Sequence, residues 1–306
     1  MFKFILPLVL SFMLSACAGM QIQQARSEVQ IIDDLAYQAD QNPRHRLDLI
    51  LPKFRATLFP VVVFVHGGYW NSQDKSYFRP FTGLYANIGI ALAKRGIGTA
   101  IVDYRIYPEV SIEGELSDVA SSTAWVQQNI AKYGGDPAKI VLAGHSAGGH
   151  MVALLACEQT RLLAAGVDLN GLIGLAPMSA IWDLEGMQRS KSEAFNASTT
   201  YPVFGTEPQV WKDFSPQTYL HQLRVPTQLI YGSKDEEYII HQNKLLETNP
   251  ALSDGFVSDD LVISATEIPD YTHEDMVLKV GQETDPVADS LADFVWQVSR
   301  SKREAQ

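Results

Sequence analysis

The sequence predicts an α/β fold: a mostly parallel β-sheet with helices on both of its faces. Strand-like and helix-like segments alternate along the chain, which favours this class over all-α or all-β folds. The middle strand candidates are continuous apolar runs, as is typical of strands buried on both faces. Hydrophobic residues make up 46% of the chain, enough to bury a sizeable core. We therefore expect one α/β domain over residues 28–302.

The eight strand candidates are short apolar runs, and the first two alternate with polar residues as half-exposed strands do. They are EVQII (28–32), RLDLIL (46–51), VVVFV (61–65), GTAIVDY (98–104), KIVLAG (139–144), GLIGLA (171–176), TQLIYG (227–232) and LVISATEI (261–268). Helices are expected over 85–95 and 115–133, because glycine follows the last apolar repeat of each.

Residues 182–222 interrupt this alternation. The stretch is long and mixed in character, and it contains three prolines amid polar residues. Excursions of this length from a compact domain are usually functional, so we expect a lid or cap that selects the substrate. A surface excursion of short helices is an equal alternative.

The N-terminal stretch MFKFILPLVLSFMLSACAG has the pattern of an export signal, which we assign to residues 1–16. Its apolar run is too short to span a bilayer. The residues Leu14-Ser15-Ala16-Cys17 resemble the lipobox of bacterial lipoproteins, in which the cysteine carries the lipid. An ordinary signal peptide is the alternative. We expect export to the cell envelope, with a lipid on Cys17, residues 17–27 as a tether, and a periplasmic or outer-membrane location.

Charge and cysteine content narrow the possible partners. The formal charge of -11 and the lack of a Lys/Arg cluster make nucleic acid an improbable partner. Once Cys17 is lipidated, Cys157 is the one remaining thiol, so no internal disulfide can form. We expect Cys157 to be a small buried hydrophobic residue.

The segment Gly144-His145-Ser146-Ala147-Gly148 has the pattern G-x-S-x-G between a strand candidate and an apolar helix candidate. This context is typical of a nucleophile elbow, a tight turn that presents a serine hydroxyl at the carboxyl end of a sheet. Side chains two positions before or after the serine would collide with backbone, which explains the glycines. We predict that Ser146 is a nucleophile.

A serine hydroxyl needs a base, and the base needs a carboxylate that orients it. In folds with this elbow the chain order is serine, acid, histidine. Only His273 follows the last strand candidate, in a predicted loop, so it is the expected base. The other histidines, which we interpret as packed or surface residues, are His45, His66, His145, His150, His221 and His241.

The expected acid is Asp235, because it follows the strand TQLIYG beside the position expected for His273. Its neighbours Glu236 and Glu237 are expected to point to solvent. Asp183, after the preceding strand, is the second candidate for the acid.

An oxyanion hole is expected after the strand VVVFV. His66 is followed there by Gly67 and Gly68, whose backbone amides carry no side-chain obstruction. With the amide of Ala147 they would hold the negative oxygen of a tetrahedral intermediate. His66 is expected to brace this loop rather than transfer protons.

Taken together, HGGYW (66–70), DYR (103–105), GGDPAKIVLAGHSAGGH (134–150), YGSKDE (231–236) and THED (272–275) resemble the HGG-type esterase/lipase branch of the α/β-hydrolase superfamily. The resemblance spans nearly the whole mature chain. HGGYW is more similar to kynurenine formamidase and related small carboxylesterases than to HGGG lipases, because Tyr69 stands where a third glycine often lies.

The resemblance implies an eight-stranded α/β-hydrolase sheet, a triad of Ser146, Asp235 and His273, and no cofactor or metal. It implies a serine carboxylesterase that cleaves short or medium acyl esters through an acyl-enzyme. An arylformamidase is one alternative, although the export signal weighs against it. The other is a catalytically idle, membrane-tethered binding protein, which the intact triad opposes. The natural substrate and the oligomeric state stay open.

Overall fold

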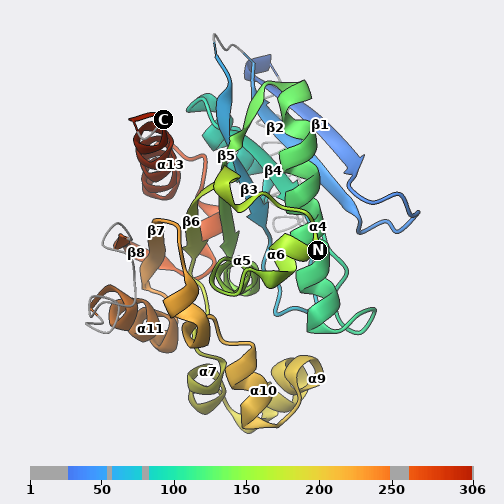
Figure 1. The fold of residues 1–306 in the computed structure, drawn as a ribbon. Helices are drawn as coiled ribbons and strands as arrows, with labels where there is room; N and C mark the ends of the chain where they lie inside the picture. Colours follow the sequence, from blue (N-terminus) through green and yellow to red (C-terminus); the bar gives the residue numbers. More distant parts are fainter. Residues whose placement is uncertain (1–26, 54–56, 78–82, 249–261, 305–306) are drawn as a thin grey trace, which may run out of the picture.

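The computed structural model describes residues 27–53, 57–77, 83–248 and 262–304, which form one eight-stranded sheet with helices on both faces (Figure 1). The strands are β1 (Val29–Ala36), β2 (Arg46–Pro52), β3 (Phe59–Val65), β4 (Gly98–Val102), β5 (Gly135–His145), β6 (Leu172–Met178), β7 (Thr227–Lys234) and β8 (Ile263–Thr272). Each contains, or largely coincides with, one of the eight predicted runs. The predicted class, an α/β fold with an eight-stranded sheet flanked by helices, is therefore confirmed.

The helices lie between the strands and after the last of them. They are α3 (Ala86–Lys94), α4 (Ile112–Asn129), α5 (Ala147–Cys157), α6 (Thr160–Ala164), α7 (Leu184–Ser190), α8 (Glu193–Phe195), α9 (Tyr201–Phe204), α10 (Pro208–Asp213), α11 (Glu237–Thr248), α12 (Asp275–Leu278) and α13 (Pro286–Glu304). Three 3₁₀-helical segments, η1 (Ile130–Tyr133), η2 (Leu169–Gly171) and η4 (Pro216–Gln222), and one π-helical segment, η3 (Asn196–Thr200), complete the described helical elements. Within these described ranges, no helix is long and apolar enough to cross a membrane.

The sheet is mostly parallel, with the strand order β1-β2-β4-β3-β5-β6-β7-β8. Only β2 runs against its neighbours, pairing antiparallel with both β1 and β4. The next pairs, from β4–β3 to β7–β8, are all parallel. The carboxyl ends of β3, β5, β6, β7 and β8 consequently meet at one edge of the sheet, where a ligand site is expected.

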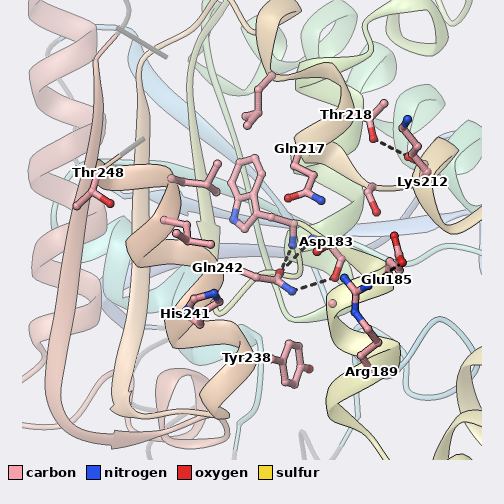
Figure 2. Close-up of a pocket in the computed structure, with 16 residues that line it drawn as sticks. Asp183, Glu185, Arg189, Lys212, Gln217, Thr218, Tyr238, His241, Gln242 and Thr248 are labelled. Carbon is pink, nitrogen blue, oxygen red and sulfur yellow. Dashed lines mark hydrogen bonds and ion pairs between the residues drawn. The ribbon is translucent and has the colours of Figure 1, made fainter. Parts of the chain in front are cut away.

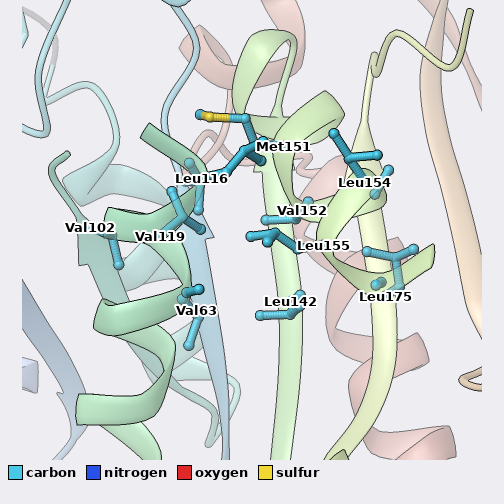
Figure 3. Close-up of a cluster of buried hydrophobic side chains, with 14 of the residues drawn as sticks. Val63, Val102, Leu116, Val119, Leu142, Met151, Val152, Leu154, Leu155 and Leu175 are labelled. Carbon is cyan, nitrogen blue, oxygen red and sulfur yellow. The ribbon is translucent and has the colours of Figure 1, made fainter. Parts of the chain in front are cut away.

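Two hydrophobic clusters hold the helices against the sheet. On one face α4, α5 and α11 pack on β3, β5 and their neighbours, and on the other face α3 and α13 do so. Figure 3 shows the first cluster, to which α4 contributes Leu116 and Val119, α5 contributes Met151 and Leu155, and β3 contributes Val63. Each such side chain, when fully buried, stabilises the fold by about 1.5–3 kcal/mol. This packing fixes α5 and the turn before it.

Several predicted boundaries differ from the structure, and three of the differences have a clear physical reason. Helix α4 begins at Ile112, three residues before the predicted start, since Ser111 has the extended conformation that suits a helix N-cap. Strand β5 begins at Gly135 rather than at residue 139, because pairing with β3 continues through Gly135. Strand β8 continues to Thr272, where a loop was predicted, because Thr272 still pairs with Lys234 of β7.

The predicted excursion contains the short helices α7–α10 and η4, which lie together beyond one end of the sheet, at the bottom of Figure 1. The alternative of short helices therefore describes the structure of the excursion, and its role as a lid stays a prediction.

Cys157 ends α5 as a fully buried free thiol, as predicted. Burial raises its pKa, so it behaves as a small hydrophobic residue. The predicted export signal and Cys17 lie outside the described residues.

Candidate active site

Ser146 sits in a tight turn between β5 and α5. Its backbone has φ 56° and ψ -120°, a conformation that costs a non-glycine residue free energy and that clusters at functional sites. Gly148 makes the turn possible: a β-carbon there would lie 2.2 Å from the carbonyl oxygen of Val65 and 2.4 Å from that of His66. The sequence therefore folds into the predicted elbow, with β3 in direct contact with the start of α5.

His273 follows β8 immediately, and Asp235 follows β7 immediately. Nδ1 of His273 lies 2.9 Å from Oδ1 of Asp235, so the structure brings the predicted base and acid together. Within the described chain, Nε2 of His273 has no hydrogen-bond partner, and none joins it to the hydroxyl of Ser146. That nitrogen is the atom that must take a proton from a serine nucleophile.

The hydroxyl of Ser179 also donates to Asp235, through the other carboxylate oxygen, Oδ2. Burial opposes ionisation of Asp235, but the bonds from His273 and Ser179 outweigh burial and hold its pKa below the ordinary value. Asp235 is thus a carboxylate that can orient His273. The sequence analysis did not predict Ser179. The one signal for it in the sequence is that it directly follows a strand, as Ser146, Asp235 and His273 do.

The other candidate acid, Asp183, lies elsewhere. It lines an open cleft of about 870 Å³ between α7, η4 and α11, which Figure 2 shows. The side chain of Gln242 holds this backbone: its Oε1 accepts from the amides of Trp182 and Asp183, and its Nε2 donates to the carbonyl oxygen of Asp183. Ser146, Asp235 and His273 do not line this cleft. The geometry therefore favours Asp235 as the partner of His273.

The HGG loop touches the elbow. A β-carbon added to Gly67 would lie 3.2 Å from Cβ of Ser146. Gly68 has φ 115°, and a β-carbon there would lie 2.2 Å from the carbonyl oxygen of Ser72, so only glycine fits. Gly68, Tyr69 and Trp70 all have positive φ values, which marks a constrained loop.

The three amides predicted to form the oxyanion hole differ in their partners. The amide of Gly67 donates to the hydroxyl of Tyr85 at 3.3 Å, and is therefore engaged within the protein. Gly67 approaches the serine closely, and its part in an oxyanion hole stays a prediction. The amides of Gly68 and Ala147 have no hydrogen-bond acceptor among the described residues, and both stay candidates.

His66 braces this loop. Nδ1 is bonded to the carbonyl oxygen of Gly67 at 2.7 Å, and Nε2 lies 3.3 Å from Oδ1 of Asp103. Its ring stacks on that of Tyr104 at a centroid distance of 4.4 Å. His66 is completely buried, and both of its nitrogens are occupied, so its contacts are those of a bracing residue.

The other histidines divide as follows. His45 is buried against Asp40 and Asp118, whereas His221 and His241 are exposed. His145 and His150 are buried beside the elbow, where His145 contacts His273 and His150 contacts Trp70. These contacts were not predicted from the sequence.

Three aromatic side chains, Tyr69, Phe195 and Tyr238, form an aromatic rim around Lys191. The ring of Tyr69 meets that of Phe195 edge to face at 5.5 Å, and Nζ of Lys191 lies 4.9 Å from the Phe195 centroid and 5.2 Å from that of Tyr238. Lys191 also forms an ion pair with Glu236, which was expected to point to solvent. Burial, then the charges of Glu236 and of Glu274 beside His273, raise the pKa of Tyr69. The excursion therefore meets the HGG loop close to His273.

The fold and this elbow define the class of protein: the chain is an α/β-hydrolase. Residues 47–249 match the BD-FAE family model, so the chain belongs to the BD-FAE family. It is 30% identical over 253 residues to a probable isoprenylcysteine alpha-carbonyl methylesterase of Arabidopsis thaliana, covering 78% of this chain and 56% of the relative. It is 27% identical over 205 residues to the kynurenine formamidase of Danio rerio, covering 66% of this chain and 61% of that enzyme.

The fold also resembles a solved structure, esterase B from Lactobacillus rhamnosis. The TM-score is 0.74 at 19% identity, over 95% of this chain and 96% of the other. The chain spans 56% and 61% of the two curated relatives above. The family and the fold are thereby established.

Proposed function

We propose that this protein is a serine carboxylesterase that cleaves esters of short or medium acyl chains. The observation that carries the proposal is the bond between Asp235 and Nδ1 of His273, one residue past adjacent strands, with Ser146 on its elbow at the same edge. Membership of a family whose relatives include a methylesterase supports ester hydrolysis. The packing of Tyr69 on Phe195, next to the loop that touches the elbow, supports a site that receives an apolar acyl group.

The reaction has two halves. His273 takes the proton of Ser146 as the serine oxygen bonds to the ester carbonyl carbon, and the carbonyl oxygen becomes negative. The amides of Gly68 and Ala147 stabilise that oxygen, and the amino-terminal end of α5 adds a favourable dipole. The tetrahedral intermediate then collapses: the bond to the alcohol oxygen breaks, and His273 gives its proton to the leaving alcohol.

Water completes the cycle. His273 takes a proton from a water molecule that attacks the acyl-enzyme, and the intermediate collapses with return of that proton to Ser146. The carboxylate of Asp235 keeps the proton of the neutral imidazole on Nδ1, so that Nε2 is the basic nitrogen in both halves.

The test uses nitrophenyl esters of increasing acyl length. We expect turnover of acetate to octanoate esters by the wild type, and a loss of about 10³-fold or more in kcat for Ser146→Ala with an unchanged unfolding temperature. A fluorophosphonate probe should label the wild type and not the variant. A folded wild type that neither cleaves these esters nor reacts with the probe would indicate an idle binding protein.

The formamidase alternative has one specific observation in its favour, the similarity to a kynurenine formamidase. Comparing kcat/KM for N-formylkynurenine with that for the best nitrophenyl ester separates the two. A formamide preference of tenfold or more would replace the ester proposal while keeping the same nucleophile.

We also propose that the mature protein is exported and anchored to a bacterial membrane through a lipid on Cys17. The support is the run Leu14-Ser15-Ala16-Cys17 at the end of the apolar segment. Expression in a bacterium with labelled palmitate should label the wild type and place it in the membrane fraction. Cys17→Ser should lose both the label and the membrane association, and a labelled variant would refute the anchor.

A further inference from the structure

We propose that His145, the residue before the nucleophile, is a positioning residue that holds the backbone of the catalytic base. The relevant contact runs from Nε2 of His145 to the carbonyl oxygen of His273, at 3.0 Å. The inference rests on the proposed function, because it takes His273 to be the base. It assigns a role to an imidazole that the reaction itself does not use.

The direction of this hydrogen bond is fixed. A backbone carbonyl can only accept, so Nε2 of His145 carries the hydrogen and Nδ1 does not. The two rings lie 4.5 Å apart between centroids, with an interplanar angle of 44°. Nδ1 faces the HGG loop, since a β-carbon on Gly67 would lie 3.4 Å from it. His145 therefore contacts the base on one side and the HGG loop on the other.

The bond matters because few contacts hold His273. In the described part of the chain, its side chain bonds only to Asp235, and its carbonyl accepts only from His145. His145 is covalently joined to Ser146, so the bond links the backbone of the base to the backbone of the nucleophile. These two restraints set where Nε2 of His273 lies relative to the serine hydroxyl. A displacement of about 1 Å between reacting groups can cost about 10²-fold in rate.

His145 also stays neutral during the reaction. Burial and then the positive charge of a protonated His273 lower the pKa of His145 to about 3. It does not compete with His273 for the serine proton, and it places no second positive charge beside the imidazolium that forms. His145 can therefore donate to the carbonyl of His273 without adding a charge beside the reacting imidazole.

The experiment compares His145→Gln with His145→Asn in the full chain. A glutamine amide can place its nitrogen close to the position of Nε2, whereas the asparagine amide is one methylene too short to reach the carbonyl of His273. We expect the glutamine variant to keep kcat within about fivefold, and the asparagine variant to lose about 10–100-fold with KM nearly unchanged. The rate of labelling of Ser146 by a fluorophosphonate should fall in the same ratio.

Unfolding temperatures show whether each variant is folded. If the asparagine variant does not fold, the glutamine variant decides alone: retained kcat supports the proposal, and a loss above about 100-fold overturns it. Equal activity of two folded variants also overturns it, whether both are active or both are impaired. None of these outcomes contradicts the proposed function, provided that the wild type cleaves esters and Ser146→Ala does not. A wild type without esterase activity or labelling would instead refute the proposed function.

Discussion

The indole nitrogen of Trp70 donates to Nδ1 of His150 at 3.2 Å, and this bond connects the HGG loop to α5, the helix that follows Ser146. On its other side, Nε2 of His150 donates to the carbonyl oxygen of Phe214 at 2.8 Å, which fastens the excursion to the same ring. Both rings are completely buried. Protonation would place a hydrogen on Nδ1, directly opposite another donor, so the three segments stay joined only while His150 is neutral.

This arrangement predicts a pH-dependent stability. Burial lowers the pKa of His150 to about 4, against about 6.5 for an unfolded histidine. As the pH falls the unfolded chain binds the proton first, so the stabilisation is complete above about pH 6.5 and is lost as the pH falls toward 4. From pH 7 to pH 5 we expect about 2 kcal/mol of unfolding free energy to be lost through this ring.

Urea denaturation at both pH values measures this loss. His150→Gln should lose about 2 kcal/mol less than the wild type between pH 7 and pH 5, because its amide does not titrate. His221→Gln, at an exposed histidine of the excursion, is the control and should behave as the wild type does. An identical pH dependence of all three proteins would contradict the prediction.

Because Asp235 and not Asp183 pairs with His273, substitutions of these two aspartates should differ in their effect on turnover. Asp235→Asn should lower kcat by about 10³–10⁴-fold with the fold intact, because an amide favours the wrong tautomer of His273. Asp183→Asn changes a residue of the cleft in Figure 2 and should leave kcat within about threefold. Steady-state kinetics on one nitrophenyl ester measure both. A greater loss in the Asp183 variant would reverse the assignment.

The hydrogen bond from Ser179 to Asp235 predicts a smaller effect on turnover. Ser179→Ala removes one of the bonds that keep this carboxylate ionised, so the pKa of Asp235 rises and its hold on His273 weakens. We expect kcat/KM to fall by about tenfold, consistent with the loss of a hydrogen bond to a charged group. Ser122→Ala is a matched control, since Ser122 is equally buried and its hydroxyl donates to a helix carbonyl, that of Val119. Equal kinetics for the two variants would show that Ser179 does not act on the acid.

The sequence predicts those parts of the site that depend on position along the chain. Ser146, Asp235 and His273 each follow a strand directly, and strands have a readable apolar pattern. Ser179 follows β6 in the same way, but a buried serine after a strand has no special pattern, and its positive φ of 47° leaves no mark in the sequence. The contacts of His145 and His150 join residues 64 to 128 positions apart, so only the folded chain brings them together.

The hydrogen bond between Gly67 and Tyr85 should stabilise the HGG loop. The Tyr85 hydroxyl accepts from the amide of Gly67 at 3.3 Å and donates to Oε1 of Gln73 at 2.6 Å. Tyr85→Phe leaves that amide without a protein acceptor in a buried loop, which should cost about 1–3 kcal/mol of unfolding free energy. We expect turnover to fall by less than about tenfold, because the amides of Gly68 and Ala147 remain as donors to the oxyanion.

Urea denaturation and ester kinetics test this variant together, with Tyr219→Phe as the control, because the Tyr219 hydroxyl donates to the carbonyl of Asp213 in the excursion. The control should change the unfolding free energy by less than about 1 kcal/mol, since that bond is exposed. If Tyr85→Phe instead lowers turnover by about three orders of magnitude, the amide of Gly67 contributes to oxyanion binding after all. An unchanged unfolding free energy would mean that Tyr85 does not support the loop.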